Sequence, residues 1–219
     1  KNVVFITAIT DPNRPERAEP YQYCIQSWKG WCQRNDVQLF VLDEPLIENM
    51  KPNYFRYYCF DLLESNEVQY DQICLVDADT IVHPNCPNFF ELTDQRFTAV
   101  HNDGDYDWII RSVENYQYEF PEFSEPFDIW KYFNSGFLVI NKSHKKIFED
   151  LLAFYWRNEN HVLSCQKRYG TGTDQPIINL IINELRTPIK LLDYRFNMQD
   201  LPRKNALENF LFLTIPGVY

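Results

Sequence analysis

Short apolar runs alternate with segments of helical hydrophobic spacing along the first third of the chain. The runs at residues 3–6, 37–42 and 73–76 have the length and composition of buried strands. Between them, apolar residues recur at helical spacing over residues 24–32 and 55–63. Strands that alternate with helices in this way predict right-handed crossovers and a doubly wound, parallel α/β sheet.

The second half has a less regular pattern. A helix is expected from Ser143, a capping residue, to about Arg157, and another near Thr173. The polar and aromatic stretch over residues 102–127 predicts no regular element. Because we find no repeat or linker, we expect residues 1–219 to form one domain with a mostly parallel, mixed sheet flanked by helices. Apolar runs predict the later strands, at residues 97–100, 137–140, 189–192 and 210–213.

Composition and charge narrow the expected partners. The chain has a formal net charge of −10 and lacks the basic surplus of a general nucleic-acid binder, so we predict no nucleic-acid partner. An acidic protein that binds an anionic ligand needs a metal ion or a few well-placed Arg and Lys side chains. The chain has no apolar run of about 18 residues, so we expect no transmembrane segment.

The six cysteines are scattered, without a CxxC pair or a zinc-type spacing. Cys24, Cys59 and Cys74 lie within apolar patterns, which predicts buried thiols. Buried free thiols are typical of a reducing compartment. Because the first apolar run has the pattern of a strand rather than of a signal peptide, we expect a cytoplasmic protein.

The sequence Asp77-Ala78-Asp79 follows an apolar run and is the strongest candidate for chemistry. Two carboxylates at the end of a buried strand can hold Mn²⁺ or Mg²⁺ at the edge where open α/β sheets bind ligands. The structural alternative is that these aspartates merely end a strand. Two further Asp-x-Asp matches overlap in residues 103–107, among Gly, Asn and Tyr, and indicate a solvated loop.

Four segments in order carry a resemblance to a known family. The segments are Tyr54-Phe55-Arg56-Tyr57, Leu75-Val76-Asp77-Ala78-Asp79-Thr80, Phe133-Asn134-Ser135-Gly136-Phe137-Leu138-Val139-Ile140-Asn141 and Gly172-Thr173-Asp174-Gln175-Pro176-Ile177-Ile178-Asn179. With them the chain resembles the glycosyltransferases of the GT-A fold, in particular the glycogenin-like family 8 group and, within that fold, the small domains of large algal viruses. The resemblance extends from about Val3 to Asn197 and implies a single Rossmann-like GT-A domain.

The resemblance implies a transferase that moves a hexose-type sugar from a UDP-sugar to a hydroxyl of a glycan or glycoprotein, with retention of configuration. A metal that bridges the two phosphates stabilises the charge that grows on the leaving diphosphate. By resemblance, Asp79 binds the metal, and Asp77 binds the metal, the ribose hydroxyls, or both. In a viral protein the compartment would be the cytoplasm of the host.

The resemblance also implies donor-binding residues at the nucleotide end. Thr7, Ala8 and Asp11 lie in the loop after the first strand, which cradles the base and ribose in such folds. Tyr21 or Tyr23 can stack on the base, although helix packing is the better interpretation of Tyr23.

Further donor contacts are implied at the sugar end. The guanidinium of Arg56 can reach phosphate or sugar hydroxyls in a forked geometry, and a surface ion pair is its alternative. Asn134, Ser135 and Gly136 would face the donor sugar with neutral polar groups and a close backbone approach, and a simple turn is their alternative.

Asp174 and Gln175 open a predicted helix and are the catalytic candidates. By resemblance, Asp174 orients donor or acceptor hydroxyls, and Gln175 approaches the anomeric carbon. A retaining enzyme needs no protein nucleophile here, because the leaving phosphate can deprotonate the acceptor. If the enzyme inverts, Asp174 is the candidate general base. A plain helix-capping role is the alternative for Asp174.

Two other functions share some of these residues. A haloacid-dehalogenase-like phosphatase would use Asp77 as nucleophile and Asp79 as general acid. That family, however, places its signature on the first strand and needs a later acidic pair that this chain lacks. A non-catalytic module that binds nucleotide sugars is the second alternative.

One departure from the family concerns the metal. The family has a third ligand, a histidine in a His-x-x-Gly-x-x-Lys segment near the C-terminus, and residues 214–219 contain no such histidine or lysine. His101, after a predicted strand, is the best substitute. Otherwise water completes the metal shell, or the natural chain continues beyond Tyr219.

Overall fold

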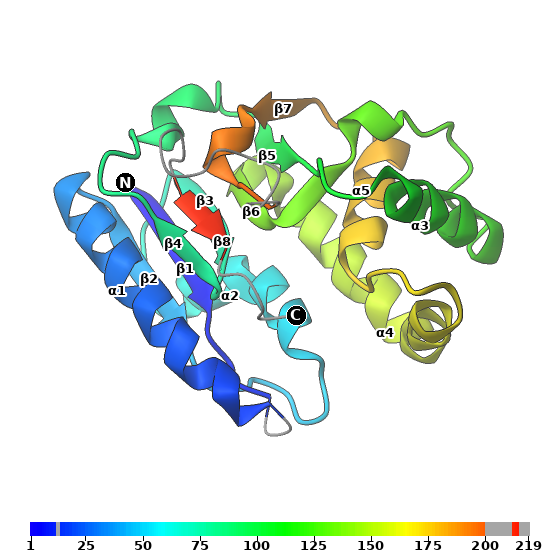
Figure 1. Cartoon of the computed structure of the whole chain (residues 1–219), viewed down its shortest axis with the longest axis horizontal. Coiled ribbons are helices and arrows are strands. Elements are labelled where there is room, and N and C mark those ends of the chain that lie inside the picture. The colour runs from blue at the N-terminus through cyan, green and yellow to red at the C-terminus, as the bar shows by residue number, and fades with distance from the viewer. Residues whose placement is uncertain (12–13, 200–211, 215–219) are drawn as a thin grey trace.

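The computed structural model of the chain describes residues 1–11, 14–199 and 212–214 (Figure 1). A six-stranded sheet forms its centre, in the order β2-β1-β3-β6-β5-β7, and β4 pairs with β8 in a small second sheet. The strands are β1 (Asn2–Thr7), β2 (Gln38–Leu42), β3 (Gln72–Asp77), β4 (Thr80–Val82), β5 (Phe97–His101), β6 (Phe133–Asn141), β7 (Ile189–Leu192) and β8 (Phe212–Thr214).

The central sheet is mixed, and β6 is the strand that makes it so. β1 runs parallel to β2 and β3, and β5 runs parallel to β7. β6 is antiparallel to both of its neighbours, β3 and β5. The carboxyl ends of β1, β3 and β5 therefore lie at the same edge of the sheet as the start of β6. The predicted class, a mostly parallel mixed sheet flanked by helices, is confirmed.

Helices cover both faces of the sheet, as Figure 1 shows. Alternate residues of β1 divide between two cores: Val3 and Phe5 pack with the helices of the second half, and Val4 and Ile6 pack with α1. This alternation follows from the two-residue period of a strand. The helices are α1 (Ala18–Arg34), α2 (Cys59–Ser65), α3 (Tyr106–Glu119), α4 (Lys145–Tyr169) and α5 (Gln175–Glu184); the 3-10 turns are η1 (Pro15–Arg17), η2 (Pro52–Tyr58), η3 (Phe89–Leu92), η4 (Ile129–Lys131), η5 (Lys142–His144) and η6 (Tyr194–Phe196).

Most strands of the central sheet lie where the apolar runs predict them, within one or two residues at their ends, although β6 begins four residues before its run. All six cysteines are buried free thiols, as the pattern predicts for three of them. Of the last predicted strand, at residues 210–213, residues 210 and 211 lie outside the described part, and β8 covers Phe212–Thr214.

The stretch at residues 102–127, for which the sequence predicts no regular element, contains the helix α3, so that prediction is wrong. Asp105 caps the helix by accepting hydrogen bonds from the backbone N–H groups of Asp107 and Trp108. Ile109, Val113 and Tyr116 then face the core at helical spacing. Charged and polar residues between these positions obscure the stripe in the sequence. The last two of the five residues of the predicted loop, Tyr106 and Asp107, are therefore helix.

The helix expected from Ser143 to about Arg157 is also longer than predicted. Asn141, rather than Ser143, caps the first turn in a reciprocal capping box with His144. α4 then runs to Tyr169, because Val162 and Cys165 continue the buried stripe. The helix ends at Gly170, whose φ of +66° is a left-handed conformation that glycine adopts without strain.

Candidate active site

Asp77 and Asp79 lie on the tight turn that joins β3 to β4. Two hydrogen bonds hold the turn in place. The Thr80 hydroxyl donates to the carbonyl of Asp77 at 2.8 Å, and the Trp28 indole donates to the same hydroxyl at 2.9 Å. Ala78 packs into the core between the two aspartates. This anchoring fixes both carboxylates at the carboxyl edge of the sheet, where the sequence places them.

The ionisation of Asp79 is strongly perturbed. Burial raises the pKa of Asp79 to about 7, and the neighbouring Asp77 carboxylate adds to this rise, whereas Arg56 and Arg17 oppose it. Two carboxylates that share a poorly solvated site favour a bound cation or proton. Perturbation of this kind is a physical marker of functional sites.

A bulge in β6 builds the next part of the site. Ala99 of β5 pairs with Leu138, but Val100 pairs with Asn134, so residues 135–137 are unpaired by β5. Bulges re-aim side chains and free backbone groups, and they are common beside active sites. Asn134, Ser135 and Gly136 are thus part of a bulged strand, not of the simple turn that was their alternative.

Arg56 connects the bulge to the acidic turn. Its guanidinium forms an ion pair with Asp77 at 2.5 Å and donates to the freed carbonyl of Ser135 at 2.9 Å. Its Nε donates to the carbonyl of Asn53. The alternative of a surface ion pair is therefore wrong, because the side chain of Arg56 is mostly buried and points at the acidic turn.

Gly136 lies close to the same carboxylate. A Cβ atom added there would lie 2.5 Å from Oδ2 of Asp77 and 2.8 Å from Oδ1 of Asn134. Only glycine leaves room for both side chains in their present positions. The Asn134 oxygen accepts hydrogen bonds from the backbone of Gly136 and from the side chain of Asn197.

Asp174 and Gln175 complete the site from the start of α5. The side chain of Asp174 makes no capping hydrogen bond among the described residues. Its two oxygens instead accept from the Asn53 amide at 2.6 Å and the Tyr57 hydroxyl at 2.7 Å. The Gln175 oxygen accepts from the backbone N–H of Ser135 at 3.0 Å. Asp174 does occupy the N-cap position of α5, but its carboxylate is held by Asn53 and Tyr57, so a plain helix-capping role does not account for it.

A cavity of about 180 Å³ lies over the acidic turn. Of the nucleotide-end candidates, Thr7 and Tyr21 line it, whereas Ala8 and Asp11 do not; Ala8 is buried in the core, and its N–H bonds to Leu42. The residues that line the cavity are Thr7, Ile9, Arg17, Tyr21, Pro52, Asn53, Arg56, Asp77, Ala78 and Asp79.

Sequence reasoning missed Arg17 and Asn53, and it gave Tyr57, within a recognised segment, no role of its own. Arg17 lies in η1, within a charged loop. The one sequence feature that could have indicated it is its positive charge, because an acidic protein needs cations where it binds a nucleotide. Asn53 immediately precedes the recognised segment that begins at Tyr54, but no spacing rule links it to Asp174. His101, the proposed substitute metal ligand, lies at the end of β5 and is not among the residues that line this cavity.

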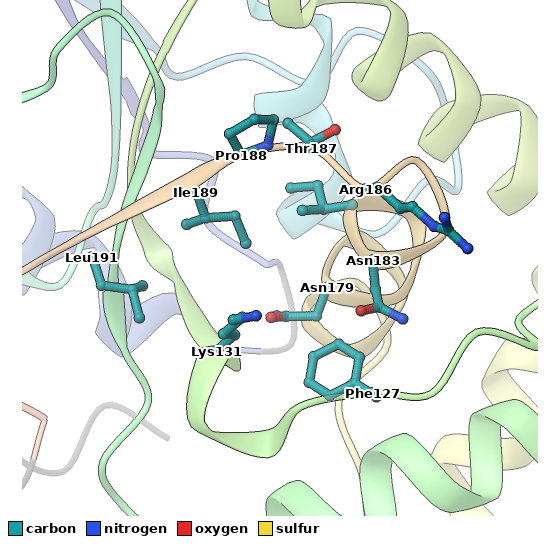
Figure 2. Close-up of a pocket in the computed structure, with 10 residues that line it drawn as sticks. Phe127, Lys131, Asn179, Asn183, Arg186, Thr187, Pro188, Ile189 and Leu191 are labelled. Carbon is teal, nitrogen blue, oxygen red and sulfur yellow. The ribbon is translucent and has the colours of Figure 1, made fainter.

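A second and larger pocket, of about 590 Å³, lies between α5, β7 and the segment that leads into β6 (Figure 2). Its charged side chains are already paired: Arg186 with Glu125 at 2.8 Å, and Lys131 with Asp128 at 3.5 Å. The Asn179 amide is held by both backbone groups of Phe133. This pocket therefore lacks the unbalanced charge of the smaller cavity.

The chain shares the GT-A fold of two glycosyltransferases of known structure. The chain aligns over its whole length with a glycosyltransferase involved in the glycosylation of the major capsid of PBCV-1 (11% identity, 94% of that chain, TM-score 0.61). It also aligns, over 98% of its length, with apo-form GlyE of Streptococcus pneumoniae TIGR4 (15% identity, 54% of that chain, TM-score 0.56).

The sequence itself gives the family. Residues 31–211 match the model of glycosyl transferase family 8, and the chain belongs to this family. No curated protein matches the chain at a significant level. Among the described residues, no helix combines the length and apolar character needed to cross a membrane.

Proposed function

We propose that this glycosyltransferase is metal-dependent, takes its sugar from a UDP-sugar, and transfers a hexose-type unit to a hydroxyl of a glycan or glycoprotein with retention of configuration. The observation that carries the proposal is the crowded pair Asp77 and Asp79, with the pKa of Asp79 raised to about 7. A divalent cation on these carboxylates relieves their repulsion and, when bound, stabilises the charge on a leaving diphosphate.

The donor set fits such a cation. Hard divalent metals prefer carboxylate oxygens, and Mn²⁺ or Mg²⁺ would take Asp79 and Asp77 with water or a further ligand completing the shell. Arg56 lies beside the same carboxylate, so that it can neutralise diphosphate charge next to the metal. Thr7 and Tyr21 extend the cavity on the side of β1, where we place the base and ribose.

We place the donor sugar over the bulge of β6. Asn134, Ser135 and Gly136 offer amide, hydroxyl and backbone groups there, and Gln175 is tied to the same backbone. The Gln175 oxygen also accepts from the Ser135 hydroxyl, so these contacts fix the orientation of the Gln175 side chain beside the bulge. This arrangement supports a role for Gln175 near the anomeric carbon.

The environment of Asp174 supports retention. Both of its oxygens accept short hydrogen bonds, from Asn53 and Tyr57, in a buried setting. A carboxylate held in this way is a rigid orienting group rather than an open general base. We therefore assign Asp174 to the positioning of sugar hydroxyls, and the acceptor proton to the leaving phosphate.

The test is a panel of nucleotide sugars with Mn²⁺, with release of nucleoside diphosphate as readout and a matched series in EDTA. We expect slow, metal-dependent hydrolysis with UDP-sugars, and a product of retained configuration by NMR once an acceptor is found. Binding without turnover would indicate the non-catalytic module instead. Cleavage of a simple phosphomonoester would favour the phosphatase, which the family and fold of this chain do not support.

A further inference from the structure

Two exposed aromatic side chains lie against each other at the edge of the sheet that holds the acidic turn. Tyr106 is 39% exposed and Trp130 is 64% exposed, and their ring centroids are 5.4 Å apart. The ring of His101 extends the pair, 6.1 Å from that of Tyr106. Contiguous exposed aromatic surface commonly marks a binding site.

The topology places this pair beyond the bulge of β6, over which we place the donor sugar. Tyr106 follows the carboxyl end of β5, and Trp130 precedes the start of β6. His101 pairs with Phe133 at that edge, and β5 lies two strands from β3. With strands spaced by about 5 Å, the end of β5 lies roughly 10 Å from the end of β3 that carries Asp77. The edge thus presents, in order, the cavity beside β1, the acidic turn, the bulge and the aromatic pair.

Both rings are presented by capped turns. Asp105 caps α3 one residue before Tyr106, and Asp128 caps η4 by accepting from the backbone N–H of Trp130. The backbone under each ring is therefore fixed before any ligand arrives, which lowers the entropy cost of binding.

We propose that Tyr106 and Trp130 form the acceptor platform, on which an uncharged sugar residue of the acceptor stacks. The inference rests on the proposed function, since it names the acceptor class of the same site. The apolar C–H face of a sugar ring fits an exposed aromatic face, and a rigid aromatic ring loses little conformational freedom on binding.

The charges around the platform select a neutral sugar. Asp105, Asp107 and Asp128 are exposed around the rings and offer oxygens that accept from sugar hydroxyls. The nearby cations already have partners, Arg111 with Asp107 and Lys131 with Asp128. The carboxylates therefore leave a negative balance that repels uronic acids and other anionic sugars.

The experiment compares four variants: Trp130→Ala, Tyr106→Ala, the conservative Trp130→Phe, and Tyr118→Ala as control. Tyr118 is 79% exposed on the same helix, near the opposite end from Tyr106. The probes are methyl glycosides of neutral hexoses, 6-deoxyhexoses and pentoses, with methyl glucuronide as the anionic probe. Acceptor KM is measured beside the rate of UDP-sugar hydrolysis without acceptor.

We expect each alanine variant to raise the KM for a neutral glycoside about 10-fold, with hydrolysis unchanged, because one aromatic stacking contact is lost. Trp130→Phe should recover most of the loss, and Tyr118→Ala should match the parent protein. An unchanged KM in both alanine variants, or a preference for methyl glucuronide, overturns the platform.

Binding without turnover separates the two proposals. If the parent protein hydrolyses no UDP-sugar, the proposed function fails, and saturation-transfer NMR with the same glycosides still tests the platform. Binding of a neutral glycoside that Trp130→Ala abolishes supports it. Absence of binding by the parent protein, or equal binding by the variant, overturns it.

Discussion

Polar side chains lie at both ends of β3, but those at the amino end have their hydrogen bonds satisfied, whereas those at the carboxyl end do not. At the amino end, the amide of Gln72 is complete: its nitrogen donates to Phe90 and its oxygen accepts from Thr93 at 2.6 Å. The nearby end of β6 is closed by the capping box of Asn141 and His144. At the carboxyl end, by contrast, Asp79 is driven toward the protonated form by burial and by its neighbour.

The difference teaches how to separate a structural polar cluster from a ligand site. Groups at the amino end satisfy one another, as buried polar groups in a stable fold must. The carboxyl end has unsatisfied capacity: Oγ1 of Thr7 and Oδ1 of Asn197 are buried without a hydrogen-bond partner in the described part of the chain. The larger pocket of Figure 2 behaves like the amino end, so pocket size is a poor guide here.

The largest expected effect comes from matched substitutions at the two ends of β3. Asp79→Asn removes the charge that we assign to the metal, and we expect donor turnover to fall by about 10³-fold or more, with loss of Mn²⁺-dependent donor binding. Asp71→Asn, an exposed acid just before the amino end of the strand, should leave both unchanged. Isothermal titration with Mn²⁺ and UDP, beside a diphosphate-release assay, measures the contrast. Full activity of Asp79→Asn would sink the metal assignment.

An intermediate effect is expected from Gly136→Ala. The added Cβ displaces the side-chain ends of Asp77 and Asn134, which can move without disturbing the core. We expect activity to fall about 10- to 100-fold while the free energy of unfolding changes by less than about 1 kcal/mol.

Gly30→Ala is the control for this prediction. Gly30 lies within α1, and an added Cβ there meets Arg34 at an ordinary 3.5 Å. Alanine in a helix interior should stabilise the protein by roughly 0.5–1 kcal/mol without loss of activity. Denaturant unfolding measures the stability of both variants, and the turnover assay measures their activity. Equal activity losses in the two variants would contradict a local role for Gly136.

The smallest effect on function, but a clear one on stability, concerns His144 at the amino end of β3. Burial lowers the pKa of His144 from 6.5 to about 4, so the unfolded chain takes up a proton that the folded protein does not. The stability contributed by the neutral ring is therefore complete above pH 6.5 and is lost as the pH falls toward 4, by up to about 3 kcal/mol.

His144→Asn keeps an acceptor for the N–H of Asn141 and removes the titration. We expect its free energy of unfolding to depend less steeply on pH between 6.5 and 4 than that of the parent protein, with unchanged turnover at pH 7.5. Urea unfolding at several pH values measures both slopes. Identical slopes would show that burial of His144 does not shape the acid sensitivity.

The sequence predicts the presence of most helices and strands better than the residues at which they end. It also predicts the main residues of the site better than the side chains that contact them. Asp77, Arg56, Ser135 and Asp174 belong to segments with recognisable order, and the structure brings them into one network through Asn53. Asn53 could not be found this way, because its contact with Asp174 spans 121 positions and depends on the fold.

Two kinds of misprediction have a physical cause. α3 was missed because exposed polar residues interrupt its buried stripe, and α4 was cut short because its later core contacts, such as Val162, are widely spaced. The sequence does not predict the bulge of β6 either, because the residues before Phe137 have the composition of a turn. Pairing with the neighbouring strand β5 makes them part of β6.

Because of the bulge, a sequence change at the site need not alter the packing of the core. In a regular strand, one inserted or deleted residue turns every following side chain to the other face of the sheet. In β6, residues 135–137 lie outside the ladder with β5, and regular pairing with β5 resumes at Leu138. Residues at the bulge can therefore be inserted, deleted or substituted, which would change the contacts proposed for the donor, while the register of the buried sheet stays as it is.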